Sequence, residues 1–124
     1  MCKLLMSINP EHVENILAGK KRYEYRKTKC KEFVDTILIY STSPIKKIVG
    51  EVEIKDIIKD SPSIVWNKTA AAAGIDRVYF DNYYSGRAFA VAYVLGKVHR
   101  FKTPRTLADY GIKSAPQSYI YIRN

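Results

Sequence analysis

The sequence predicts an α+β fold, a small mixed β-barrel of about six strands decorated by two or three short helices. Three observations lead to this prediction. Runs rich in β-branched and aromatic residues recur along the chain, separated by Gly and Pro. Two helix starts consist of a capping residue followed by Pro, at Asn9 and at Ser61. The expected strands and helices do not alternate regularly, which argues against a doubly wound sheet. The chain of 124 residues is expected to form one domain, residues 1–124.

The first segment is expected to form a strand and a short helix. Residues 3–8 are mostly apolar and predict the strand. Asn9 is a good helix cap, and Pro10 suits the first helical position. Apolar residues at i, i+3 and i+4 give this helix one buried face: Val13, Ile16 and Leu17. Gly19 lies where a left-handed C-terminal cap is needed, so we expect a sharp turn there.

The next strand is predicted by a period of two over residues 22–26. Glu24 and Arg26 fall on one face, and the two tyrosines between the charged residues fall on the other. Lys21 is out of phase with Glu24. The two side chains therefore share a face only if the strand begins after Lys21 or if a bulge intervenes.

Two further strands and two helices are expected in the middle of the chain. Residues 34–40 are rich in β-branched residues, and residues 48–58 form a longer run in which Gly50 marks a bulge. One helix is expected between the cap Ser61 and the stop Gly74, and another between the cap Asp76 and the stop Gly86.

The last third of the chain is expected to add three strands. Residues 87–95 are apolar on both faces and predict a central strand. Gly96 is interpreted as a break, and residues 98–102 are interpreted as the partner strand. A helical turn is expected at 107–110, and residues 118–122 alternate and predict the closing strand.

The composition favours a polyanionic partner. Lys and Arg number 21 against 12 Asp and Glu, a formal charge of +9 that attracts nucleic acid or an anionic membrane surface. No apolar run approaches the ~20 residues of a membrane span, and an Asn-Pro pair follows the start too soon for a secretory leader. We therefore expect a cytoplasmic protein with no membrane partner. His12 and His99 lie far apart, so we expect no metal and no cofactor.

The strongest functional signal is a basic run that contains one acid. Between residues 20 and 31 seven side chains are Lys or Arg, and Glu24 is the only carboxylate. A solvated surface usually mixes charges of both signs, so this run predicts a site that faces an anion. A carboxylate repels phosphate. We therefore expect Glu24 to orient a cation or to accept a hydrogen bond from a base amino group, as acids do with cytosine N4.

Within this run Gly19, Lys21, Glu24 and Arg26 spell G-x-K-x-x-E-x-R, directly after the expected first helix. In that position the pattern resembles the ASCH domain family, which shares the PUA-like barrel. The resemblance extends over nearly the whole chain, to the small, stand-alone prokaryotic branch of the family. It includes residues 5–11, the strand at Gly50, and the segments 107–111 and 116–119.

The resemblance implies a barrel with a cleft into which the motif residues project, and a role in binding RNA or nucleotides. Some members of the family are metal-independent ribonucleases, and others are amidohydrolases that remove an acyl group from a modified cytidine. In the amidohydrolases a threonine nucleophile takes the position of Glu24, and the glutamate here argues against that activity. Similar proteins are also described as transcription regulators, but no helix-turn-helix is expected in this sequence.

Each candidate residue has a functional and a structural interpretation. Lys21 and Arg26 are expected to hold phosphate; the alternatives are a solvated lysine and an ion pair with Glu24 that braces the barrel mouth. Tyr25 either stacks on a base or packs in the barrel wall. The other candidate nucleic-acid contacts are Ser41, Ser43 and Gln117. A second basic set either extends a groove or is solvated: Arg87, Lys97, Arg100, Lys102 and Arg105.

Three functions remain open at this point. The first is a module that binds RNA or a nucleotide in the basic cleft. The second is a metal-independent hydrolase that acts on RNA or on a modified nucleoside, with Lys21 as general acid or base and Glu24 in the catalytic site. The third is a regulatory module that contacts an acidic protein partner.

Overall fold

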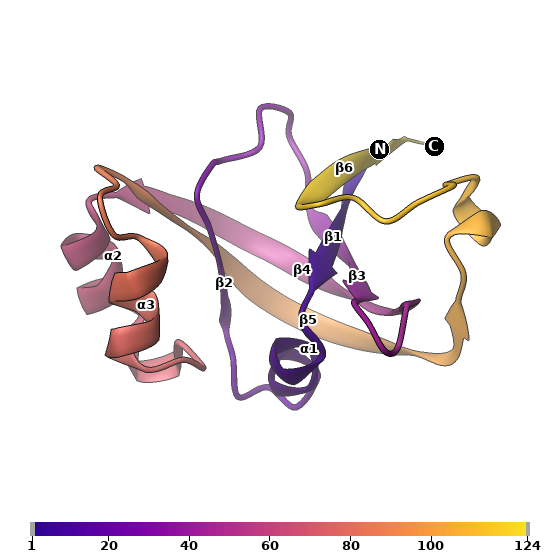
Figure 1. Cartoon of the computed structure of the whole chain (residues 1–124), viewed down its shortest axis with the longest axis horizontal. Helices are drawn as coiled ribbons and strands as arrows, with labels where there is room; N and C mark the ends of the chain where they lie inside the picture. Colours follow the sequence, from indigo (N-terminus) through magenta and orange to yellow (C-terminus); the bar gives the residue numbers. More distant parts are fainter. Residues whose placement is uncertain (1, 124) are drawn as a thin grey trace.

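The computed structural model describes residues 2–123 and has the mixed α+β architecture that the sequence predicts (Figure 1). One sheet contains six strands in the order β2-β5-β4-β3-β1-β6. The strands are β1 (Cys2–Ile8), β2 (Tyr23–Arg26), β3 (Thr36–Ser41), β4 (Lys47–Asp60), β5 (Ala90–Arg105) and β6 (Tyr119–Arg123). The helices are α1 (Pro10–Leu17), α2 (Pro62–Thr69) and α3 (Arg77–Tyr83), with 3₁₀ turns η1 (Ala70–Ala72) and η2 (Ala108–Tyr110).

The sheet of residues 2–123 does not close into a barrel through backbone hydrogen bonds, but side chains of Arg26 and Ser118 bridge its open side. β1 and β3 are parallel, and the other neighbouring strands are antiparallel. β2 and β6 are the two edges of the ladder. Arg26 of β2 nevertheless donates to the backbone carbonyl of Ser7 on β1 at 3.0 Å and to the hydroxyl of Ser118, just before β6, at 3.2 Å. The sheet is therefore curled, with its first edge facing β1 and β6.

β5 is one continuous strand, so the prediction of two strands at 87–95 and 98–102 is wrong. Both halves of β5 pair with β4, and the register of the two strands shifts on either side of Ile54. A register shift of this kind bends a strand pair without ending it. Gly96 leaves room for the bend, because a Cβ there would lie 2.1 Å from Glu53 Oε1. The bulge predicted at Gly50 is confirmed by the register shift between Ile48 and Gly50.

The core lies on both faces of the sheet. Leu4 and Met6 of β1 pack with α1 on one face, and Leu5 between them packs on the other face with Phe101 of β5. A separate cluster, centred on Phe80, packs under α2 and α3. Figure 1 shows these two helices together at one end of the long β4–β5 pair, away from α1. The beginning of β2 thus lies between two separately packed helical elements.

Two of the helix starts use the caps that the sequence predicts. Asn9 Oδ1 accepts a hydrogen bond from the amide of Glu11 at 3.0 Å, and Asp76 Oδ1 accepts one from the amide of Tyr79 at 2.8 Å. Ser61 precedes α2 without a side-chain cap bond. The three α-helices have seven or eight residues each, so no helix in residues 2–123 has the length and apolar content of a membrane span.

Candidate functional site

A tight turn after α1 determines where Lys21 points. Gly19 has a φ of +77°, a conformation that glycine adopts without strain. The amides of Lys20 and Lys21 then both donate to the carbonyl of Asn15, at 2.9 and 3.0 Å. β2 begins only at Tyr23. Lys21 therefore precedes the strand, which is the condition under which it can share a site with the residues of β2.

The Lys21 side chain is buried although it carries an ammonium group. It is 3% exposed. Its Nζ donates to the carbonyl of Ala73 at 3.1 Å and lies 4.7 Å from the centroid of the Tyr25 ring. Lys21 forms no ion pair with a residue in the range 2–123. Burial lowers the pKa of Lys21, an effect that nearby Glu24 opposes and Arg26 reinforces.

A short segment between α2 and α3, residues 70–74, covers Lys21. The carbonyl of Ala72 accepts a hydrogen bond from the amide of Arg22 at 2.9 Å, and Ala73 binds the ammonium. Gly74 has a φ of +74°, and a Cβ at this position would lie 2.5 Å from Lys21 Cβ. The sequence predicts Gly74 only as a helix stop. In the structure it also lets the backbone approach Lys21 closely.

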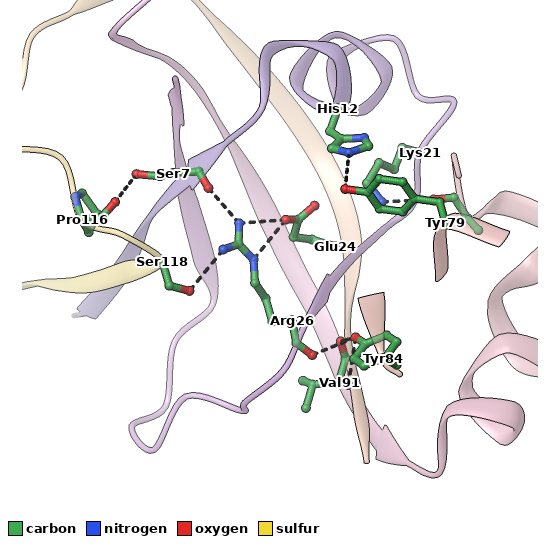
Figure 2. Close-up of polar contacts among 11 residues, drawn as sticks. Ser7, His12, Lys21, Glu24, Arg26, Tyr79, Tyr84, Val91, Pro116 and Ser118 are labelled. Atoms are coloured by element: carbon green, nitrogen blue, oxygen red, sulfur yellow. Dashed lines mark hydrogen bonds and ion pairs between the residues drawn. The ribbon is translucent and has the colours of Figure 1, made fainter. Parts of the chain in front are cut away.

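Glu24 and Arg26 form a buried ion pair with one unused carboxylate oxygen. Glu24 Oε2 accepts hydrogen bonds from Arg26 Nε at 3.1 Å and from Nη2 at 2.8 Å. With its bonds to Ser7 and Ser118, Arg26 thus makes four hydrogen bonds from the five N–H groups of a guanidinium. Glu24 Oε1 accepts no hydrogen bond from residues 2–123, and Figure 2 shows it pointing away from Arg26.

These side chains meet at a partly enclosed cavity of about 170 Å³. Its lining residues come from β1, the start of α1, β2 and its preceding turn, and α3 with the residues before it. They are Ser7, Ile8, Asn9, His12, Lys21, Glu24, Tyr25, Arg26, Ile75, Tyr79 and Tyr83. A cavity of about 150 Å³ in another protein binds one benzene ring. This cavity therefore has room for one planar ring, between aromatic walls and beside an ammonium and a carboxylate.

His12 and two tyrosines of α3 complete the cavity, and the sequence does not predict them as site residues. His12 Nε2 lies 3.4 Å from the hydroxyl of Tyr79, and the two rings meet edge to face (Figure 2). Burial lowers the pKa of His12, and the charge of Lys21 lowers it further. Tyr79 and Tyr83 are four residues apart on α3 and so lie on one face of this helix. The spacing of these two tyrosines is the sequence feature that could have indicated that they share a site.

The structure brings together four of the predicted site residues and leaves three outside the cavity. Lys21, Glu24, Tyr25 and Arg26 all line it. Ser41 is the buried last residue of β3, Ser43 lies on the exposed loop after it, and Gln117 is exposed beside Ser118. None of these three lines the cavity. Their contacts with nucleic acid stay predictions.

Tyr25 forms part of the cavity wall and also packs in the core. Its hydroxyl donates to Thr69 Oγ1 at 2.7 Å, and its ring meets Phe80 at a centroid distance of 5.2 Å. Burial raises the pKa of Tyr25 to about 12, so its hydroxyl stays protonated at neutral pH. Trp66 packs against Phe80 in the same cluster, outside the cavity.

Comparison with known proteins identifies the family. The sequence model of the ASCH domain matches residues 6–104. The chain belongs to the ASCH domain family. Two solved structures, of the ASCH protein from Zymomonas mobilis and of a mutant of it, superpose on this ASCH domain with a TM-score of 0.89 each. They are 24% and 23% identical to it, and the match covers 98% of this chain and 88% and 91% of theirs. This likeness confirms the fold.

This ASCH domain is similar in sequence to parts of several proteins that have different names and functions from one another. It is 27% identical over 121 residues to the large ribosomal subunit protein uL22 and to the ATP synthase subunit alpha of Ureaplasma parvum. These matches cover 97% of this chain but only 39% and 15% of the two relatives. It is also 26% identical over 92 residues to an ASCH domain-containing ribonuclease of Zymomonas mobilis, covering 73% of this chain and 62% of that protein.

The substitution Gly74→Ala is expected to destabilise the fold more than Gly86→Ala. Both glycines have a φ of +74°, so both substitutions strain the backbone by about 1–2 kcal/mol. At Gly74 the new Cβ would clash with Lys21. At Gly86 no atom lies within 4 Å of the new Cβ. Urea unfolding should therefore show an additional loss of roughly 1–3 kcal/mol for Gly74→Ala. Equal losses would contradict the packing of residues 70–74 on Lys21.

Proposed function

We propose that this ASCH domain binds RNA by enclosing one base in the cavity beside Lys21. The observation that carries the proposal is the convergence of two polar groups on a space for a single ring. One is the buried ammonium of Lys21, and the other is the Glu24 oxygen that Arg26 leaves free. Most of the other lining residues are aromatic or apolar, as in most sites for small planar ligands.

The two polar groups match a base that presents a donor next to an acceptor. Glu24 Oε1 accepts from an exocyclic amino group, and the ammonium of Lys21 donates to a base oxygen or ring nitrogen. Lys21 has three N–H donors and uses one for Ala73, so it keeps donors for a ligand. Cytosine fits this arrangement through N4. In a base that has a carbonyl in place of the amino group, the carbonyl oxygen would face Glu24 Oε1, and neither of these two acceptors could donate a hydrogen bond.

We assign binding of the RNA phosphates to exposed lysines and not to Arg26. Arg26 already makes four hydrogen bonds, and we assign it the role of a positioning residue that orients Glu24. Lys20 lies within the motif and Lys27 directly follows it, and both side chains are exposed. Lys27 Nζ lies 4.9 Å from the ring of Tyr83, a residue of the cavity wall. These lysines contribute to the charge of +9 that favours a polyanion.

The similarity to the ASCH domain-containing ribonuclease of Z. mobilis supports RNA as the ligand class. A domain that acts on RNA must first bind it, and enclosing a base is one way to hold a strand in a fixed register. The two Ureaplasma relatives match this chain over a minor part of their length. Their names therefore do not guide the proposal.

The substitution Lys21→Ala is expected to weaken binding of single-stranded RNA at least ten-fold. It removes a charged donor from a desolvated site, a loss worth about 1.5–3 kcal/mol. Fluorescence anisotropy over a salt series measures the affinity. Lys55→Ala is the matched control, because Lys55 is an exposed lysine that lines no part of the cavity. Absence of RNA binding by the wild type at low salt, or equal losses in the two variants, would contradict the proposal.

Oligocytidine is expected to bind roughly ten-fold or more tightly than oligouridine of the same length. Uracil carries a carbonyl oxygen where cytosine carries its amino group, and so meets the Glu24 carboxylate with an acceptor. Glu24→Gln should remove most of this preference, since an amide both donates and accepts. Glu14→Gln, in an exposed ion pair with Arg100, controls for the lost charge. A preference that survives in Glu24→Gln would show that Glu24 does not contact the base.

RNA cleavage without a metal is a second candidate, favoured by the lowered pKa of Lys21. Cleavage of a phosphodiester requires a base for the 2′-hydroxyl, an acid for the leaving oxygen and a cation for the developing charge. In this second function Lys21 supplies the base, a cavity tyrosine supplies the acid, and Arg26 supplies the cation through the one N–H that its four hydrogen bonds leave over. The same base would serve hydrolysis of a modified nucleoside.

If this second function holds, wild-type protein cleaves RNA in the presence of EDTA and Lys21→Ala does not. The rate should rise with pH as Lys21 loses its proton and level off above the lowered pKa of Lys21. Gel analysis of the products over a pH series measures both effects. RNA that stays intact with the wild-type protein would eliminate cleavage and leave the binding proposal standing.

A further inference from the structure

The size of the cavity places the neighbours of an enclosed base outside it. A space of about 170 Å³ holds one ring and not a second nucleotide. A continuous strand must therefore lay its next nucleotide on the protein surface at the cavity mouth. The side chains at this mouth decide whether the domain binds a free nucleotide or a strand.

Tyr79 is an exposed aromatic side chain at this mouth. It is 51% exposed although it lines the cavity, whereas Tyr25 in the same wall is 6% exposed. α3 places Tyr79 one turn before Tyr83, which is half-buried deeper in the same wall. One face of α3 thus continues from the cavity to the surface as an aromatic strip.

Contacts at both ends of Tyr79 hold its ring in place. Its backbone amide donates to Asp76 Oδ1 at 2.8 Å in the cap of α3. Its hydroxyl lies 3.4 Å from His12 Nε2, and Figure 2 shows the hydroxyl end of the ring pointing to the imidazole. A ring that is held through its hydroxyl end keeps its face for another ring. Because the side chain is already ordered, a base that stacks on it incurs little additional entropy loss.

The ammonium group of Lys27 lies on the face of α3 that carries Tyr79 and Tyr83. The ammonium of Lys27 is 4.9 Å from the ring of Tyr83, one turn from Tyr79. Aromatic faces beside exposed lysines are the combination that single-stranded nucleic acids bind, because the bases stack while the ammonium groups neutralise the backbone. An acidic protein segment would use the lysines but has no need of the open tyrosine face.

We propose that Tyr79 is the stacking platform for the nucleotide next to the enclosed base, so that the ligand is a strand of at least two unpaired nucleotides. This inference rests on the proposed function, because it requires a base in the cavity. Stacking on an aromatic side chain strengthens binding by roughly 5- to 150-fold per base and tolerates any base identity. Tyr79 therefore adds affinity for a strand, while Lys21 and Glu24 determine which base is enclosed.

The test compares cytidine 5′-monophosphate with a cytidine tetranucleotide by isothermal titration calorimetry. Tyr79→Ala should weaken binding of the tetranucleotide roughly 5- to 150-fold more than it weakens binding of the monophosphate, because only the tetranucleotide carries a second base to stack on the exposed ring. Tyr79→Phe keeps the ring and loses only the contact with His12, so it should lose much less tetranucleotide affinity than Tyr79→Ala. Val78→Ala is the matched control, because Val78 is the preceding residue, is 68% exposed and does not line the cavity.

Three results would overturn the stacking role. They are an unchanged tetranucleotide affinity in Tyr79→Ala, an equal loss for both ligands, and a loss in Tyr79→Phe as large as in Tyr79→Ala. The second result would make Tyr79 a wall of the cavity, and the third would assign the effect to the His12 contact. If Tyr79→Ala does not fold, Tyr79→Leu keeps the bulk without a ring and is held to the same comparisons. A wild-type protein that binds neither ligand would overturn the proposed function itself, whereas a wild type that binds both, with Tyr79→Ala unchanged, would overturn only this inference.

Discussion

The guanidinium of Arg26 joins parts of the chain that the backbone ladder leaves apart. β2 has four residues, and within residues 2–123 it pairs only with β5. Arg26 connects its other side to the carbonyl of Ser7 on β1 and to Ser118 before β6. The remaining bonds of Arg26 hold one oxygen of Glu24 and thereby direct the other away from the pair (Figure 2). The link across the open side of the sheet and the orientation of the candidate site therefore depend on the same side chain.

The site contains the buried ammonium group of Lys21, which lowers the stability of the folded state. Burial of the Lys21 ammonium costs free energy, which the carbonyl of Ala73 and the ring of Tyr25 offset only in part, as the lowered pKa of Lys21 indicates. The fold nevertheless accommodates this side chain closely, with a glycine at position 74 where any Cβ would meet it. A destabilising group that is held this closely is typical of a functional site. A ligand acceptor at the ammonium would recover part of the cost.

A feature of this fold or site can be predicted from the sequence when the residues that determine it are close together along the chain. The sharp turn before Lys21 is predictable, because the cap of α1 and the glycine at position 19 are local signals, but the sequence leaves open whether Lys21 meets Glu24. Gly96 is misinterpreted because a turn and a bend in a long strand pair both favour glycine, and only the partner strand distinguishes them. His12 and Tyr79 are 67 positions apart and meet only through the packing of α1 and α3, for which the sequence carries no local signal.

The central claim is that a base lies between the Lys21 ammonium and the free oxygen of Glu24. Amide NMR of the labelled protein during titration with a cytidine tetranucleotide tests this claim most directly, because it locates the ligand without assuming the site. The account predicts that the largest chemical-shift changes occur at Lys21, Glu24 and Tyr79 and saturate together. Changes confined to the second basic set on β5, from Lys97 to Arg105, with the cavity residues unmoved, would contradict it.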